Sequence, residues 1–241
     1  MKYKKILGPK LYDILYKIYV SWGLKHTISC IHKNNGKFTA VSAVDFLFSK
    51  DAKLIKPMQI REEILELARR IEKKRPSVIL EIGTARGGTL FLASQLAADD
   101  ALIISIDLPG GMYGGGYPDW KIPFYKAFKK KNQVIELIQG DSHSDEVLMK
   151  LKILLNKRTI DYLFIDGDHT YEGVKKDFDT YSRLLSPGSF VAFHDIVSDK
   201  SPVPDHFVHR FWEEIKIKHS STEIIKDRNQ SKLGIGILQM N

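Results

Sequence analysis

The chain has 241 residues, 43% of them hydrophobic and 27% charged, which is the composition of a globular protein with enough apolar residues for a full core. A single cysteine excludes an internal disulfide framework and fits a reducing compartment, and no apolar run is long enough to span a bilayer. The formal net charge of +8 raises the question of nucleic-acid binding, but the lysines are scattered in short clusters without a binding-module signature. We therefore expect a cytoplasmic α/β protein for which nucleic acid is not the partner.

The first predicted element is an amphipathic helix close to the N-terminus. Its apolar residues recur at helical spacing: Leu11, Ile14, Leu15 and Ile18. Asp13 and Lys17 interrupt the apolar stretch, so it does not fit a signal peptide. The apolar face has three candidate partners: the rest of the chain, a second copy, or a membrane surface. We expect docking within the protein or its dimer, and we assign residues 1–56 to a helical extension for docking or homo-oligomerisation.

From residue 57 onward, short apolar runs alternate with helical patterns. The predicted strands are residues 77–83, 101–107, 133–141, 160–168, 188–195, 222–227 and 232–239. The predicted helices are residues 59–74, 89–97, 145–157, 171–185 and 206–217. Apolar strands without alternation, separated by helices, are typical of a parallel sheet covered on both faces. We predict a Rossmann-like α/β domain over residues 57–241, with a seven-stranded, mostly parallel sheet.

A glycine-rich loop over residues 108–120 interrupts this alternation, with five glycines and two prolines. It follows the carboxyl end of a strand, where open α/β sheets bind ligands. Loops this long inside a domain are usually functional. We predict a lid that is mobile without ligand, with Tyr113, Tyr117 and Trp120 as contacts, over the alternative of a disordered insertion.

The turn after the first of these strands, "EIGTARGGTL", has the glycines that let a backbone approach a ligand closely. Ala85 stands where a dinucleotide fingerprint has its second glycine, and Glu81 precedes the turn, so NAD is disfavoured. Asp107 ends the next strand, where a carboxylate can accept hydrogen bonds from both ribose hydroxyls. Asp141 and Ser142 end the third strand at the same edge of the sheet.

The stretch "FIDGDHTYEGVKKDF" places Asp166, Asp168 and His169 directly after an apolar strand. Carboxylates this close repel each other, and sites that keep them usually hold a cation or move protons. The alternative is a solvated turn before a helix, with Asp168 or Thr170 as the N-cap. That alternative accounts for one carboxylate and leaves the others without a role.

Together these motifs resemble class I S-adenosylmethionine-dependent methyltransferases: E-x-G-x-x-x-G-G, the strand-ending Asp107, G-D-S at residues 140–142, and D-G-D-H-x-Y at residues 166–171. "FIDGDHTYEGVKKDF" with "SPGSFVAFHDI" is more narrowly similar to the branch of macrocin-type sugar O-methyltransferases and cephalosporin-hydroxylase-like proteins. The resemblance covers about residues 57–240. It implies S-adenosylmethionine as cofactor, Mg²⁺ or another divalent cation, and a small-molecule hydroxyl as the methyl acceptor.

The resemblance also implies a role for individual residues. Its implied cofactor-binding residues are Glu81, Gly83, Thr84, Ala85, Thr89, Asp107, Asp141, Ser142 and Asp166. Within this set, Gly83 to Ala85 would line the methionine part with Thr89 at its carboxylate. Asp107 would bind the ribose, and Asp141 with Ser142 would flank the adenine. The implied metal ligands are Asp166, His194 and Asp195, with His194 at a position that is often acidic in related enzymes, and His169 is the implied general base.

Three other functions remain as alternatives. A non-catalytic cofactor-binding module would leave Asp166, His169 and Asp195 without purpose. An RNA methyltransferase would use the basic surface and show salt-sensitive RNA binding, but the motif expected for base methylation is missing. An NAD-dependent oxidoreductase is disfavoured by Ala85 and Glu81.

Overall fold

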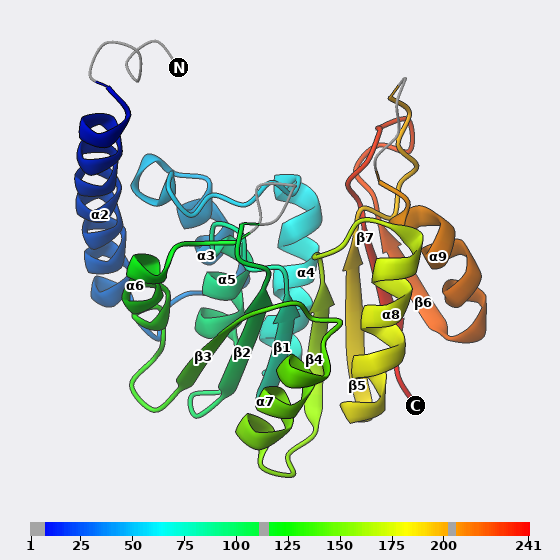
Figure 1. The fold of residues 1–241 in the computed structure, drawn as a ribbon. Coiled ribbons are helices and arrows are strands. Elements are labelled where there is room, and N and C mark those ends of the chain that lie inside the picture. The colour runs from blue at the N-terminus through cyan, green and yellow to red at the C-terminus, as the bar shows by residue number, and fades with distance from the viewer. Residues whose placement is uncertain (1–7, 111–115, 202–205) are drawn as a thin grey trace.

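The structure is a computed structural model that describes residues 8–110, 116–201 and 206–241. Within these residues the chain forms one seven-stranded sheet in the order β3-β2-β1-β4-β5-β7-β6 (Figure 1). The strands are β1 (Val78–Ile82), β2 (Leu102–Asp107), β3 (Val134–Gln139), β4 (Ile160–Ile165), β5 (Leu185–His194), β6 (Ser220–Ile224) and β7 (Ile235–Gln239). Strands β1 to β5 pair in parallel, and β7 runs antiparallel between β5 and β6. The predicted Rossmann-like fold is confirmed.

Helices cover both faces of this sheet because its central strands are buried on both sides. In β1, the side chain of Ile79 enters one apolar cluster, while Leu80 and Ile82 enter the other. The first cluster packs under α4 (Arg61–Lys74) and α5 (Gly88–Leu96). The second packs under α7 (Asp145–Leu155), α8 (Tyr171–Tyr181) and α9 (Val208–Ile215). Short helical segments complete the chain: η1 (Lys50–Ala52), η2 (Asp119–Lys121), α6 (Ile122–Lys126), η3 (Ser182–Leu184) and η4 (Lys216–Lys218).

The N-terminal residues form the long helix α2 (Pro9–Lys33) and the short helix α3 (Ala40–Leu47). The predicted helix is present. Its predicted apolar face does not pack on the described part of the chain, so of the predicted docking within the protein or its dimer, docking in a dimer stays a prediction. All four residues of that face are exposed: Leu11, Ile14, Leu15 and Ile18. The residues that pack on the domain instead occupy the opposite side and begin further along the helix: Val20, Leu24, Thr27 and Ile31. Helix α2 is apolar on two sides, and only one of them is covered by the described chain.

The strand order reverses between β1 and β4, since β2 and β3 lie on one side of β1 while β4 and β5 lie on the other. Ligands of open α/β sheets bind at such a reversal, beyond the carboxyl ends of the strands. Gly83, with φ of +96°, follows β1 at this point, and a Cβ there would lie 2.0 Å from the backbone oxygen of Asp166. Only glycine fits this close approach, which brings the turn after β1 against the turn after β4.

The predicted lid lies partly outside the described residues, because residues 111–115, including Tyr113, are not among them. Of its two other predicted contacts, Tyr117 is buried, 3% exposed, and its ring centroid lies 5.1 Å from that of Tyr125. Trp120 is half-buried in η2. The lid itself stays a prediction.

Candidate active site

The turn after β1 is held by the carboxylate at the end of β2. Asp107 Oδ2 accepts hydrogen bonds from the backbone N–H of Thr84 at 3.0 Å and of Ala85 at 2.7 Å, and Oδ1 accepts one from Gly116 at 2.9 Å. Burial raises the pKa of the Asp107 carboxyl, and these backbone donors oppose that rise. Asp107 therefore lies beside the glycine turn, as the sequence predicted, and fixes its conformation.

Glu81 is enclosed below this turn rather than open to solvent, with 2% of its surface exposed. Its Oε2 accepts a hydrogen bond from Ser105 at 2.5 Å, and the side chain of Thr89 also bonds to it. Burial raises the pKa of the Glu81 carboxyl to about 7. Its enclosed carboxyl thus ties Thr89, at the start of α5, to Ser105 on β2.

The residues after β3 extend the same edge of the sheet. The Asp141 side chain is 57% exposed, and its Oδ1 accepts a hydrogen bond from the N–H of His143 at 2.8 Å. The Ser142 carbonyl accepts a hydrogen bond from the Tyr181 hydroxyl at 2.5 Å, and its side chain bonds to Asp177. The Asp141 carboxylate is therefore exposed beside His143. Ser142, in contrast, is anchored to α8 through Tyr181 and Asp177.

The acidic turn after β4 and the end of β5 form one cluster of carboxylates and imidazoles. His194 Nδ1 lies 3.1 Å from Asp166 Oδ1 and 3.4 Å from Asp195 Oδ2. His169 Nδ1 lies 3.4 Å from the same Asp195 oxygen, and His169 Nε2 lies 3.8 Å from Asp166 Oδ1. Asp166 and Asp195, 29 positions apart in the sequence, thus converge because β4 and β5 are neighbouring parallel strands. The structure brings together all four residues predicted for the metal and base site.

The pKa values of the two predicted histidines in this cluster shift in opposite directions. Burial would lower the pKa of the His194 imidazole, but the carboxylates of Asp166 and Asp195 outweigh burial and raise that pKa well above its usual range. Burial lowers the pKa of His169, and the same carboxylates only partly offset it. Without a cation, the two carboxylates therefore favour a protonated His194, whereas burial favours a neutral His169. A cation bound between the carboxylates would take the place of the His194 proton, because only a neutral imidazole is a metal ligand.

Two further residues complete the cluster, and the sequence reading missed both. Gln59 Nε2 donates a hydrogen bond to Asp166 Oδ2 at 2.7 Å, from the segment that precedes α4. His206 Nε2 lies 3.6 Å from Asp195 Oδ2, and its ring centroid is 4.3 Å from that of His169. Asp168, the remaining carboxylate of the acidic turn, has a structural role. Its Oδ1 accepts a hydrogen bond from the Thr170 N–H at 2.8 Å, and Thr170 is the N-cap of α8.

The donor atoms of this cluster fit a divalent cation. Asp166, His194 and Asp195 each offer one ligand atom, and these atoms lie within 4.8 Å of one another. His169, Asp195 and His206 form a second such group that shares Asp195. Carboxylate oxygens are good ligands for Mg²⁺ and Mn²⁺. Imidazole nitrogens are better ligands for Zn²⁺ or Fe²⁺ than for Mn²⁺. Among the described residues, His194 Nε2 is a buried nitrogen without a hydrogen-bond partner.

Comparison with known proteins shows similarity to a methyltransferase family model. Residues 80–196 match the family model described as a methyltransferase domain. An uncharacterized protein of Acanthamoeba polyphaga mimivirus is 31% identical over 140 residues, which are 55% of this chain and 57% of that protein. The chain therefore spans little more than half the length of this curated relative.

Two solved structures share the fold. The O-methyltransferase from Bacillus cereus in complex with SAH superposes with a TM-score of 0.57 at 17% identity, covering 83% of this chain and 91% of that one. The O-methyltransferase TomG from Streptomyces achromogenes, involved in tomaymycin synthesis and in complex with SAM, gives a TM-score of 0.51 at 16% identity, covering 73% and 78%. At these identities the likeness shows the fold. The match of residues 80–196 to the methyltransferase-domain model agrees with the enzyme class predicted from the sequence, an S-adenosylmethionine-dependent methyltransferase.

Proposed function

We propose that the chain is an O-methyltransferase that transfers the methyl group of S-adenosylmethionine to a hydroxyl of a small molecule, with a divalent cation at the acceptor site. The observation that carries the proposal is the convergence of Asp166, His169, His194 and Asp195 at the point where the strand order reverses. Gly83 approaches the backbone of Asp166 there, so a cofactor on the glycine turn would lie next to the cluster.

The cofactor would lie along the carboxyl ends of β1, β2 and β3. The main chain of Gly83, Thr84 and Ala85 would line its methionine part, with Thr89 near the carboxylate. Asp107 is already oriented at this turn by two backbone donors and would accept from the ribose hydroxyls. Asp141 and Ser142 would flank the adenine. Glu81 would act through Thr89, which it holds, because its own carboxyl is enclosed.

The acceptor hydroxyl would lose its proton to His169. Methyl transfer to oxygen needs a better nucleophile than a neutral alcohol, and a neutral imidazole near the hydroxyl can take the proton. Burial keeps the pKa of His169 low, which favours the neutral form. Asp166, His194 and Asp195 would hold the cation, Mg²⁺ or another divalent ion, whose chemistry when bound is to lower the hydroxyl pKa. The sulfonium is a good leaving group, so positioning supplies much of the remaining effect.

The class of acceptor rests on the resemblance of the acidic turn and the end of β5 to the macrocin-type and cephalosporin-hydroxylase-like branch. We propose a sugar or another natural product as the acceptor on that basis. RNA methylation and cofactor binding without turnover are less favoured, because neither needs the Asp166, His169 and Asp195 arrangement.

Replacing Asp107 by alanine is expected to weaken S-adenosylmethionine binding by about 1–3 kcal/mol, because it removes a charged acceptor of hydrogen bonds. Part of the loss would come from the turn, since the N–H groups of Thr84 and Ala85 also lose their acceptor. Calorimetric titration of the cofactor into both proteins measures the difference. Asp161→Ala is the matched control, because that carboxylate binds the backbone of Ser77 and Val78 at the opposite end of β1. Equal affinity of wild type and Asp107→Ala would remove Asp107 from the cofactor site.

A further inference from the structure

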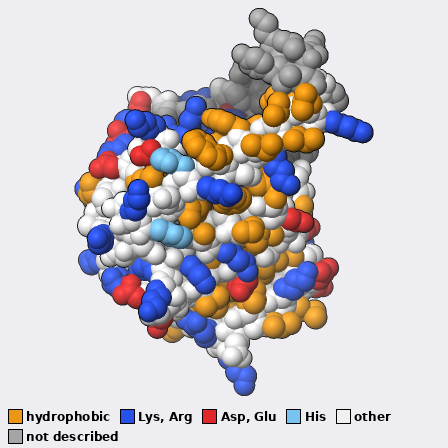
Figure 2. Space-filling model, turned by 90° about the vertical axis from the view of Figure 1, so that its left-hand side faces the viewer, with side chains coloured by type: hydrophobic (Ala, Val, Ile, Leu, Met, Phe, Trp, Pro, Cys, Tyr) orange, Lys and Arg blue, Asp and Glu red, His pale blue; other side chains and the backbone are white. Residues whose placement is uncertain are grey.

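The outer side of α2 is apolar and lies open in the described chain. Its large side chains are between 44% and 75% exposed: Leu11 47%, Ile14 58%, Leu15 44%, Ile18 60%, Tyr19 62% and Trp22 75%. Their spacing places them along one side of the helix. We call these six residues the outer face of α2. Figure 2 looks onto this side of the molecule and shows hydrophobic side chains gathered in its upper part.

This face needs a partner for reasons of helix stability. Only the second half of α2 packs on the domain, beginning with Val20 and Leu24, while residues 13–19 are all exposed. Figure 1 shows the N-terminal part of α2 standing clear of the sheet and its helices. A few turns of helix without tertiary packing are marginal in water. A helix that is apolar on two opposite sides is typical of one that is covered on both.

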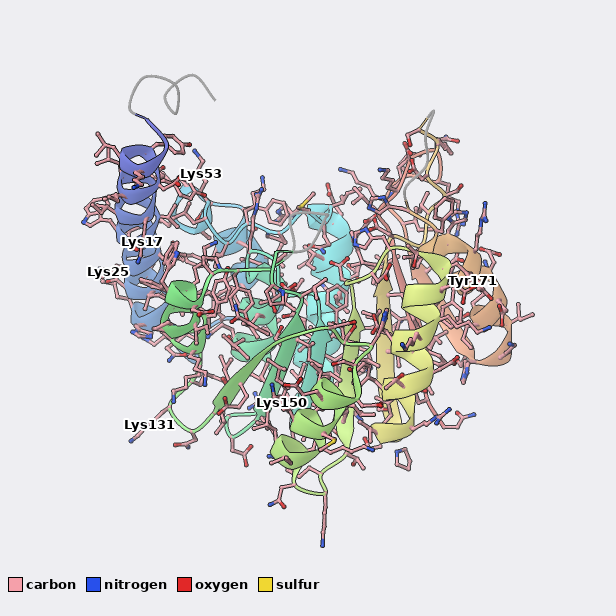
Figure 3. The ribbon with its side chains drawn as sticks, in the orientation of Figure 1. Lys17, Lys25, Lys53, Lys131, Lys150 and Tyr171 are labelled. Carbon is pink, nitrogen blue, oxygen red and sulfur yellow. The ribbon has the colours of Figure 1, made fainter. Side chains whose placement is uncertain are left out.

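The charges around the outer face indicate what covers it. Helix α2 contains four lysines and one acidic residue, Asp13. Figure 3 places Lys17 and Lys25 on this helix and Lys131 further along the same side of the molecule. The whole chain has a net charge of +8, which opposes the association of two copies and favours an anionic partner. An apolar helix face with tyrosine and tryptophan, bordered by lysines, matches the surface of a bilayer that contains anionic lipids.

We propose that the outer face of α2 docks the protein on the surface of an anionic lipid bilayer. The helix would lie on the membrane, with Ile18 and Trp22 among the acyl chains and Lys25, three positions after Trp22, at the phosphate level. No helix in the described part of the chain is long and apolar enough to cross a membrane. This inference is independent of the proposed catalytic chemistry, because it concerns a surface outside the methyltransferase match at residues 80–196.

Flotation of the full-length protein with lipid vesicles tests the proposal. The protein is expected to float with phosphatidylcholine vesicles that contain about 30% phosphatidylserine, to bind pure phosphatidylcholine more weakly, and to lose binding as salt rises. The double variant Ile18→Glu, Trp22→Glu is expected to bind at least about 100-fold more weakly, near tenfold for each buried side chain lost. The thermal unfolding transition of every variant, measured in parallel, checks that the domain is folded.

Ile153→Glu is the matched control, because Ile153 on α7 is 74% exposed, close to the 75% of Trp22, but lies away from α2. It should bind vesicles like wild type. A wild-type protein that does not bind anionic vesicles would overturn the proposal, and so would a double variant that binds as well as the control. Wild-type dimers that dissociate in the double variant, with no vesicle binding, would assign the face to a second copy instead.

Discussion

Replacement of His169 by alanine is expected to lower turnover by about 10²–10⁴-fold, the usual loss when a general base is removed. His169 Nδ1 lies 3.4 Å from Asp195 Oδ2, and His169 Nε2 lies 3.8 Å from Asp166 Oδ1. Both ring nitrogens therefore face the cluster. Burial lowers its pKa, and the neutral imidazole is therefore present at neutral pH. Methyl transfer from labelled S-adenosylmethionine to a panel of sugars and natural products with free hydroxyls measures the effect.

Two controls separate loss of the base from loss of the site. Cofactor affinity of His169→Ala should match wild type, because the glycine turn and Asp107 are unchanged. His26→Ala should keep full turnover, since His26 is half-exposed on α2 and contacts Asp51 rather than the cluster. Turnover of His169→Ala within threefold of wild type would show that another group takes the proton; His206, whose ring lies 4.3 Å away, is the first to test in that case.

Removal of divalent cations is expected to abolish turnover and to spare cofactor binding. Asp166, His194 and Asp195 have ligand atoms within 4.8 Å of one another, and carboxylates so close are stabilised by a cation. Turnover should return with Mg²⁺ or Mn²⁺, and a titration series that includes Zn²⁺ tests the influence of the imidazole donors. Asp166→Asn should mimic the chelator, with weaker cation binding by calorimetry and a loss of turnover of a similar order.

Asp168→Asn provides the matched control for Asp166→Asn, because Asp168 lies two positions after Asp166 in the same turn. Asp168 accepts a hydrogen bond from the N–H of Thr170, and asparagine can accept the same bond. This variant should keep cation affinity and turnover and lose at most about 1 kcal/mol of stability. Full turnover in the presence of chelator would refute the cation site, and the Asp166 carboxylate would then have a structural role through Gln59 and His194.

The strands of the sheet could be predicted from the sequence because parallel strands that are buried on both faces appear as unbroken apolar runs. The predicted strand at residues 101–107 compares with Leu102–Asp107 in the structure, where every residue is buried. The convergence of Asp166 and Asp195 followed from the same pattern, since the carboxyl ends of neighbouring parallel strands share one edge. The glycine turn and Asp107 were predictable for the same reason.

Other parts of the site depend on contacts that no local pattern encodes. Gln59 lies 107 positions before Asp166, and glutamine is not a residue type that marks a base or a metal site. His206 begins a segment that the sequence presents only as a helix. Periodicity alone cannot decide which side of α2 packs on the domain, because the helix is apolar on both sides. Val20 and Leu24 pack, whereas Leu11 and Ile18 do not.

Calorimetric titration of S-adenosylmethionine into the full chain, with NAD⁺ titrated in parallel, tests the central claim most directly because it does not require the acceptor. The account predicts saturable binding of one S-adenosylmethionine per chain, with or without chelator, and no binding of NAD⁺. Binding should also raise the unfolding free energy, by about 2.7 kcal/mol at a ligand concentration 100-fold above the Kd. A chain that binds no S-adenosylmethionine, or that binds NAD⁺ as tightly, would contradict the account.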